Sequence, residues 1–228
     1  QAAKAGVRLP GFDAFWQAGV LRIESETPVP GVMLEAFRLD PAAHPLRTPS
    51  GRIEIFSERI AGFGLPDCPG HPTWMQPREW LGAPLAVRFP LHLLSDQPDR
   101  RLHSQLDASP HSAAGKVAGR QPVSLNPQDA AARGIRDGDV VRVFNDRGAC
   151  LAGAVVTDAI RSGVARLSTG AWYDPGPDGL ERHGNPNAFT LDLPASELSQ
   201  GCAAQTCLVE IERWEGPVPR IEAHDLPE

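Results

Sequence analysis

Hydrophobic and polar positions follow different patterns in the two parts of this chain. Residues 85–228 contain short apolar runs separated by closely spaced turn residues, whereas residues 1–84 are rich in Pro and punctuated by Gly. Short strands at such close spacing are typical of a compact barrel rather than of a parallel sheet. The pattern therefore predicts a mainly β domain with short helices at 85–228, preceded by a segment of another kind.

Five apolar runs in the second part predict strands. They are residues 87–95 (VRFPLHLLS), 140–144, 150–156, 163–170 (GVARLSTG) and 205–214 (QTCLVEIERW). The turn Asp146-Arg147-Gly148 lies between the second and third runs and predicts a hairpin. Upstream of that hairpin, NPQDAAARG predicts a short helix with Asn126 as its N-cap and Gly134 as its stop signal.

The first part of the chain contains three local patterns. In PGFDAFWQAGVL (10–21) the aromatic residues can share one face of a short helix. In TPSGRIEIFSERI, Ile53 and Ile55 alternate with charged residues, which predicts a half-buried strand. The stretch GFGLPDCPGHPTW (62–74) is dominated by Gly and Pro, so we expect a connector there.

The composition is that of a globular protein, with 41% hydrophobic residues among 228. The net charge of −6 argues against binding to long nucleic acids, because their phosphates are neutralised by many Lys and Arg residues. The longest apolar run, at 81–95, is interrupted by Pro and charged residues, so no membrane span is predicted. The four cysteines, of which only Cys202 and Cys207 are close in sequence, predict reduced core thiols.

The stretch 100–120 is locally basic. Four of its side chains are cationic and one is anionic; they are Arg100, Arg101, Lys116 and Arg120 against Asp107. This excess of positive charge could hold a small anionic ligand, and a solvated basic patch is the alternative.

The segment RLHSQLD (101–107) is the densest group of polar side chains, with only Leu102 and Leu106 as apolar anchors. His103 next to Ser104 suggests a hydrolase, but neighbouring residues of an extended chain point to opposite faces and no G-x-S-x-G elbow is present. His103 and His111 lack the carboxylates of a metal site. A hydrogen-bonding loop for a ligand is therefore favoured, and an ordinary polar turn stays open.

Three later stretches also carry candidate binding groups. In HGNPN (183–187) two Asn side chains flank a Pro and could match the edge of a purine or pterin, although these residues alone favour a simple turn. Gln200-Gly201 precedes the last predicted strand, where Gly allows a ligand to approach the backbone. Trp172 and Tyr173 could cover a ligand, but we favour a plug in the core.

The order of six stretches along the chain resembles the C-terminal portion of the dimethyl-sulfoxide-reductase family of molybdenum enzymes. Within that family it is most similar to the biotin sulfoxide and trimethylamine N-oxide reductases. The stretches are TPSGRIEIFSE, PLHLLSDQPDRRLHSQLD, NPQDAAARGIRDGDVVRVFNDRGACLAGAVV, GAWYDP, HGNPN and SQGCAAQTCLVEIER.

The resemblance implies a fold, a cofactor and a set of contact residues. The fold is a six-stranded double-psi β-barrel preceded by a partial α/β segment and connector. Residues 1–84 would be the tail of the preceding domain, and residues 85–228 the molybdopterin dinucleotide-binding domain. The cofactor is molybdenum-bis(molybdopterin guanine dinucleotide). The implied cofactor contacts are Ser95, Gln97, His103, Ser104, Gln105, Asn185, Asn187, Gln200 and Gly201.

The resemblance also implies a function for a longer polypeptide: reduction of S-oxides or N-oxides by oxygen-atom transfer, with an unidentified electron donor. No catalytic or metal-ligating residue is expected here, because the molybdenum-ligating serine belongs to domains outside this chain, which alone should be inactive. Gln1 and the absence of a signal-like segment lead us to expect a piece of a longer chain. The similarity to biotin sulfoxide reductases implies the cytoplasm as its compartment rather than the periplasm. The alternative is a stand-alone double-psi barrel that serves as a protein-interaction module, which the orphan FDAFW helix disfavours.

Overall fold

The computed structural model describes residues 9–22, 31–202 and 206–225. The chain divides into two compact units, Gln1–Phe56 and Ser57–Glu228. The domain division expected at 84/85 stays a prediction, and the first strand of the second unit begins at Leu91. Within the described residues, none of the helices has the length and apolar character needed to cross a membrane.

The described part of the first unit contains two short helices, α1 (Phe12–Ala18) and α2 (Glu35–Leu39). The helix predicted in 10–21 is confirmed. The strand predicted around Ile53 and Ile55 is wrong, because this segment forms bends and the two side chains are 69% and 79% exposed. A strand needs a hydrogen-bonded neighbour, and the described residues of this unit offer none.

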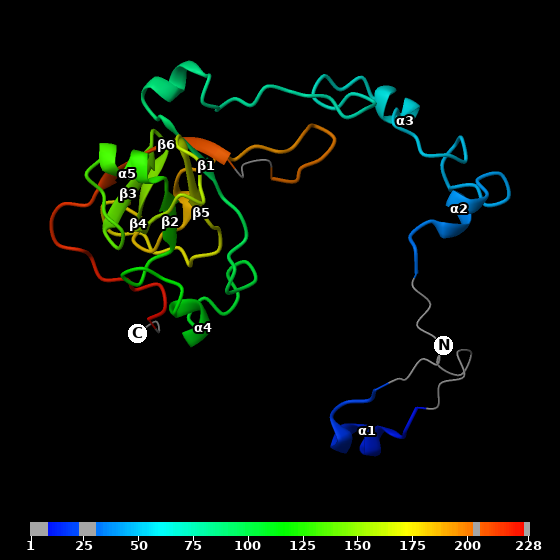
Figure 1. Ribbon diagram of the computed structural model, residues 1–228, viewed down its shortest axis with the longest axis horizontal. Coiled ribbons are helices and arrows are strands. Elements are labelled where there is room, and N and C mark those ends of the chain that lie inside the picture. The colour runs from blue at the N-terminus through cyan, green and yellow to red at the C-terminus, as the bar shows by residue number, and fades with distance from the viewer. Residues whose placement is uncertain (1–8, 23–30, 203–205, 226–228) are drawn as a thin grey trace. The chain divides into compact units, whose positions relative to one another are not determined.

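Six strands in the second unit close into a barrel (Figure 1). They are β1 (Leu91–Leu94), β2 (Pro122–Leu125), β3 (Val140–Asn145), β4 (Gly148–Val156), β5 (Val164–Leu167) and β6 (Thr206–Arg213). Around the barrel the order is β1-β5-β2-β4-β3-β6, with parallel pairs β1–β5 and β2–β4 and four antiparallel pairs. The six-stranded double-psi barrel expected from the resemblance is confirmed.

Among the described residues, five short helical elements belong to this unit, two before β1 and three between the strands. They are α3 (Glu58–Ala61), η2 (Pro84–Val87), α4 (Pro110–Ala113), α5 (Pro127–Ala132) and η3 (Pro186–Ala188). The prediction for α5 is confirmed in detail, since Asn126 Oδ1 accepts from the Gln128 amide at 2.9 Å and Gly134 has a φ of +64°. All five strands predicted in residues 85–228 are present. Strand β2 is not predicted by the sequence pattern, and its four residues begin with Pro122.

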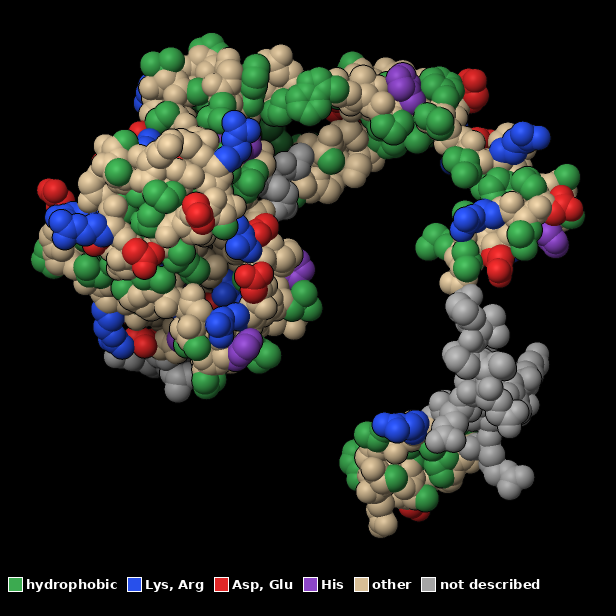
Figure 2. Space-filling view, in the orientation of Figure 1, with side chains coloured by type: hydrophobic (Ala, Val, Ile, Leu, Met, Phe, Trp, Pro, Cys, Tyr) green, Lys and Arg blue, Asp and Glu red, His purple; other side chains and the backbone are tan. Residues whose placement is uncertain are grey.

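The barrel interior is a core of aliphatic side chains. Alternate residues of β3 point inward, so that Val141 and Val143 are fully buried while their neighbours are half-exposed. Cys150 and Cys207 belong to this core, as predicted for the thiols, but Cys202 is exposed and the prediction is wrong there. On the face of the barrel unit seen in Figure 2, basic and acidic side chains are interspersed, so that face shows no uniform field for a polyanion.

Candidate functional site

The segment 101–107 is held at its two charged ends rather than by its leucines. Arg101 donates to the main-chain oxygens of His103 (3.1 Å) and Thr169 (3.2 Å) and to Gln121 Oε1 (2.7 Å). Leu102 and Leu106 are exposed, so their predicted role as anchors is wrong. The physical reason is that the segment crosses the outside of the barrel, where a guanidinium can reach several carbonyl oxygens at once.

Asp107 anchors the other end and is completely buried. Its Oδ1 lies 2.9 Å from Lys116 Nζ and 3.4 Å from Arg101 Nε, and its Oδ2 accepts from the Trp172 amide at 3.2 Å and lies 3.0 Å from His224 Nε2. Burial raises the pKa of Asp107. The hydrogen bond and charge of Lys116, the Trp172 amide and His183 lower it, and together they outweigh the effect of burial. The net direction is downward, so Asp107 is an ionised carboxylate.

His183 extends this network and is neutral. Burial lowers its pKa to about 4, with a further contribution from the charge of Lys116. Its Nδ1 lies 2.9 Å from Trp172 O and its Nε2 lies 2.6 Å from Lys116 Nζ. A neutral ring with its proton on Nδ1 satisfies both contacts, since it donates to the carbonyl and accepts from the ammonium.

Asp107, His183 and His224 also bring three potential metal-ligand atoms within 4.8 Å of one another. However, Lys116 Nζ already contacts both Asp107 and His183, so an ammonium group stands where a cation would bind. A second positive charge at this distance would be repelled. The cluster is therefore a buried charge network rather than a metal centre.

A cavity of about 470 Å³ opens next to this network. Four of the expected contact residues line it, namely His103, Ser104, Asn185 and Asn187. Residues 169–173 and Ala223 complete the lining. The structure thus brings together two stretches that are some eighty residues apart in the sequence, as expected for a binding site rather than for two independent turns.

The loop that carries Asn185 and Asn187 is organised by Glu181, which the sequence analysis missed. This fully buried carboxylate accepts four main-chain hydrogen bonds of 2.7 to 3.1 Å, from residues 174, 183, 184 and 185. Burial raises the pKa of Glu181, and these four amides act in the opposite direction. An acidic residue among Gly, Pro and Arg gives no sequence signal that distinguishes it from a surface residue.

The two asparagines of this loop have different roles. The amide of Asn185 is used inside the chain, because Nδ2 donates to Ala171 O at 2.8 Å and Oδ1 accepts from the Asn187 amide at 2.9 Å. Asn187 is exposed at the cavity. Asn185 therefore fixes the shape of the loop, whereas Asn187 lies exposed at the cavity wall.

Trp172 and Tyr173 line the cavity and are 44% and 57% exposed. The prediction of a core plug is therefore wrong. The indole of Trp172 donates to Ser104 O at 2.7 Å, which holds the ring at the cavity wall instead of in the barrel. A polar N–H that finds its partner at the surface explains why the ring is not interior.

The remaining expected contact residues lie around or away from the cavity. Ser95 is buried directly after β1, and Gln97 Nε2 lies 3.2 Å from His103 Nδ1. Gln105 is exposed and does not line the cavity. Gln200 and Gly201 lie in an exposed loop before β6, closed by a bridge between Pro194 and Cys202.

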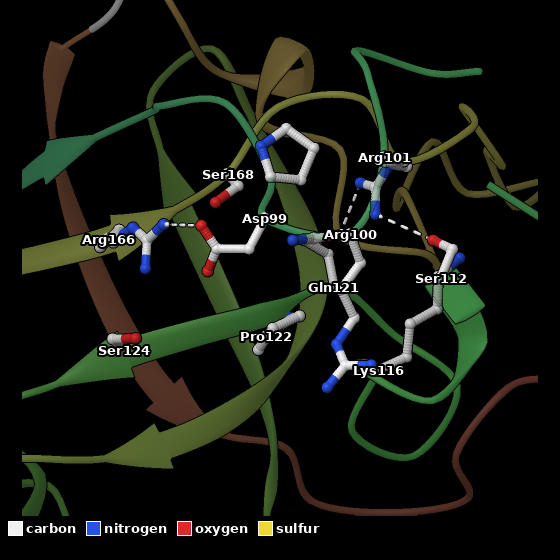
Figure 3. A pocket seen from close by; sticks show the side chains of 12 residues that line it. Asp99, Arg100, Arg101, Ser112, Lys116, Gln121, Pro122, Ser124, Arg166 and Ser168 are labelled. Atoms are coloured by element: carbon white, nitrogen blue, oxygen red, sulfur yellow. Dashed lines mark hydrogen bonds and ion pairs between the residues drawn. The ribbon is translucent and has the colours of Figure 1, made fainter. Parts of the chain in front are cut away.

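A second, basic cavity of about 100 Å³ has Arg101 in its wall (Figure 3). Its charged lining residues are Asp99, Arg100, Arg101, Lys116 and Arg166, accompanied by the hydroxyls of Ser112, Ser124 and Ser168. Arg166 is paired with Asp96 (2.6 Å) and Asp99 (3.7 Å), whereas Arg100 has no carboxylate within 4 Å among the described residues. Arg120, which the sequence analysis grouped with this patch, is buried and bonds main-chain oxygens.

Gly170 permits the close contact between the two halves of the first cavity, which yields a prediction. Its φ is +92°, and a Cβ there would stand 2.0 Å from His103 O. Gly179 is a matched control, with a φ of +80° and open space around a Cβ. Gly170→Ala should lower the free energy of unfolding by about 1–3 kcal/mol more than Gly179→Ala, measured by denaturant titration. Equal losses would contradict the packing argument.

Comparisons with known proteins identify the family of the barrel domain. Residues 91–208 match the family described as "Molydopterin dinucleotide binding domain". The chain is 50% identical over 227 residues to trimethylamine-N-oxide reductase 1 of Escherichia coli (strain K12), covering 97% of the chain and 27% of that protein. It is 50% identical over 211 residues to biotin sulfoxide reductase of Cereibacter sphaeroides, covering 91% and 28%.

Among solved structures, acetylene hydratase from Pelobacter acetylenicus aligns with a TM-score of 0.59 and 21% identity, over 77% of this chain and 25% of that one. At this identity the similarity shows the fold alone. The chain spans about a quarter of the length of the curated relatives cited above.

Proposed function

This chain belongs to the molydopterin dinucleotide-binding domain family, and from that premise we propose that it holds molybdopterin guanine dinucleotide in the C-terminal part of a molybdenum-dependent reductase of S-oxides or N-oxides. The observation that carries the proposal is the 470 Å³ cavity, which gathers His103, Ser104 and Asn187 beside two exposed aromatic rings. Imidazole, hydroxyl and amide groups offer the donors and acceptors that a pterin edge requires.

The chemistry of the two cavities fits such a dinucleotide. The larger cavity has the size and mixed lining of a site for a heterocycle. The basic cavity is the smaller of the two, and its arginine and hydroxyl lining suits a phosphate group. Arg100 and Arg166 both point toward this space in Figure 3 and would contact the phosphate oxygens.

In this proposal the residues of the chain bind and orient the cofactor and take no part in bond breaking. We propose the bis-dinucleotide form of the cofactor. When bound, its molybdenum would supply the chemistry of oxygen-atom transfer, with electrons from the donor. The dinucleotide is contacted directly by His103, Ser104 and Asn187. Gln97 orients the ring of His103. Ser95 and Asn185 shape the two loops from within.

The dinucleotide is larger than the first cavity, so its contacts extend beyond it. We place Gln105, Gln200 and Gly201 in that outer set, as the resemblance implies. The proposal includes the rest of a longer polypeptide, an oxide substrate and an electron donor as partners. It also includes the cytoplasm as the compartment, in preference to the periplasm.

The test is an anaerobic fluorescence titration of the chain with molybdopterin guanine dinucleotide. His103→Ala combined with Asn187→Ala should weaken binding about thirtyfold, because two hydrogen bonds of about 1 kcal/mol each are lost. Gln128→Ala is the control, since this exposed residue of α5 lines neither cavity. Equal affinities for the parent chain, the control and the double variant would show that the cavity is not the binding site.

A further inference from the structure

The chain that follows β6 is fastened to the cavity region at several successive points. Residues 219–225, here called the strap, contact three other segments. Arg120 Nη2 donates to Pro219 O at 2.5 Å, the Glu222 amide donates to Asp174 Oδ2 at 3.0 Å, and Arg182 Nη2 donates to Glu222 Oε2 at 3.0 Å. Because these contacts join residues between 40 and 99 positions apart, the strap has a defined course over the barrel unit.

The strap ends at the binding cavity. Ala223 lines the 470 Å³ cavity, and the next residue, His224, lies edge-on to the rings of Trp172 and His183 at 5.1 Å in both cases. His224 Nε2 is 3.0 Å from Asp107 Oδ2. One side chain of the strap thus touches the cavity wall, the neutral histidine and the carboxylate that anchors segment 101–107.

The contact with Asp107 has a clear physical consequence. The carboxylate is 0% exposed, and His224, which contacts it at 3.0 Å, is 30% exposed, so the imidazole is the partly exposed member of the groups that cover Asp107. Oδ1 faces the cations of Lys116 and Arg101, whereas Oδ2 depends on the Trp172 amide and His224. Removal of the imidazole admits water to the buried ion pair of Asp107 and Lys116. The ion pair then anchors segment 101–107 less firmly.

We propose that the strap completes the dinucleotide site and that His224 is a positioning residue, which acts through Asp107 to hold His103 and Ser104 at the cavity. The inference rests on the proposed function for the identity of the ligand. It adds to that function a segment outside the family match, which ends at residue 208. It also explains why a tail with little secondary structure makes directed polar contacts.

The experiment compares three variants of the chain. His224→Ala removes the contact, His224→Gln keeps an N–H that can donate to Asp107 Oδ2, and Glu215→Ala changes an exposed residue upstream of the strap. Amide hydrogen exchange by mass spectrometry should show about tenfold faster exchange at 101–107 and 171–173 in His224→Ala alone. Exchange in the barrel strands should stay at the parent rate, and His224→Gln should recover most of the protection.

Titration with molybdopterin guanine dinucleotide gives the second readout. His224→Ala should bind about tenfold more weakly than the parent, with affinity largely restored in His224→Gln. Exchange that rises equally in the strands and in 101–107, or His224→Gln behaving like His224→Ala, would overturn the positioning role. If the parent chain itself binds no dinucleotide, the proposed function is wrong, whereas the exchange comparison still decides for or against the strap.

Discussion

Asp107→Ala is expected to lower the free energy of unfolding by about 3–5 kcal/mol, the typical cost of removing one partner from a buried ion pair. Lys116 and Arg101 have side chains only 5% and 3% exposed and would lose their common carboxylate. Burial already lowers the pKa of Lys116, and Asp107 works against that shift. Without Asp107 the ammonium loses its proton more easily, so the cost should be larger at pH 7 than at pH 9.

Denaturant unfolding of the chain measures this loss. Asp158→Ala is the matched control, since Asp158 is exposed, and its effect should stay within about 0.5 kcal/mol. Combining Asp107→Ala with Lys116→Met should cost less than Asp107→Ala alone, because no unpaired ammonium remains. A loss below about 1 kcal/mol for Asp107→Ala would show that the network does not stabilise the fold.

Acidification from pH 7 to pH 4 is expected to destabilise the chain by about 3 kcal/mol through His183. Its pKa is lowered from 6.5 to about 4 in the folded state, so the unfolded chain binds a proton first as pH falls. The contribution of neutral His183 to the free energy of unfolding is complete above pH 6.5, and it is lost as the pH falls from 6.5 to 4. Each unit of pKa difference corresponds to about 1.4 kcal/mol, which gives the stated magnitude.

The prediction is checked by the pH dependence of the unfolding free energy in His183→Gln. This variant should lack the slope between pH 6.5 and 4, while loss of stability from protonation of Asp107, whose pKa is lowered, begins only at more acidic pH. His44→Gln, at an exposed position outside the barrel, should reproduce the parent profile. Parallel curves for His183→Gln and the parent would refute the assignment.

The sequence by itself determined the local elements of this protein. The cap of α5, the hairpin between β3 and β4 and the alternation of Val141 and Val143 all depend on neighbours within a few residues. Their signals can therefore be read from short windows. The order of the motifs indicated the family, and with it the loops around the cavity, before any contact was known.

Only the tertiary structure decided what depends on distant partners. Strand β2 exists because β4 and β5 hydrogen-bond it on both sides, and its four residues carry too little pattern to reveal this. Ile53 and Ile55 have a strand-like pattern but, among the described residues of their unit, no strand to pair with.

The candidate site shows the same division. The sequence predicted a binding role for 101–107 and 183–187, which stays a prediction, but it did not show that Asp107 would be buried with His224, 117 residues later. It also did not show that Glu181 would order the asparagine loop or that Trp172 would stay at the surface. Burial and ion pairing arise from segments that meet only when the barrel closes, so no local pattern could encode them.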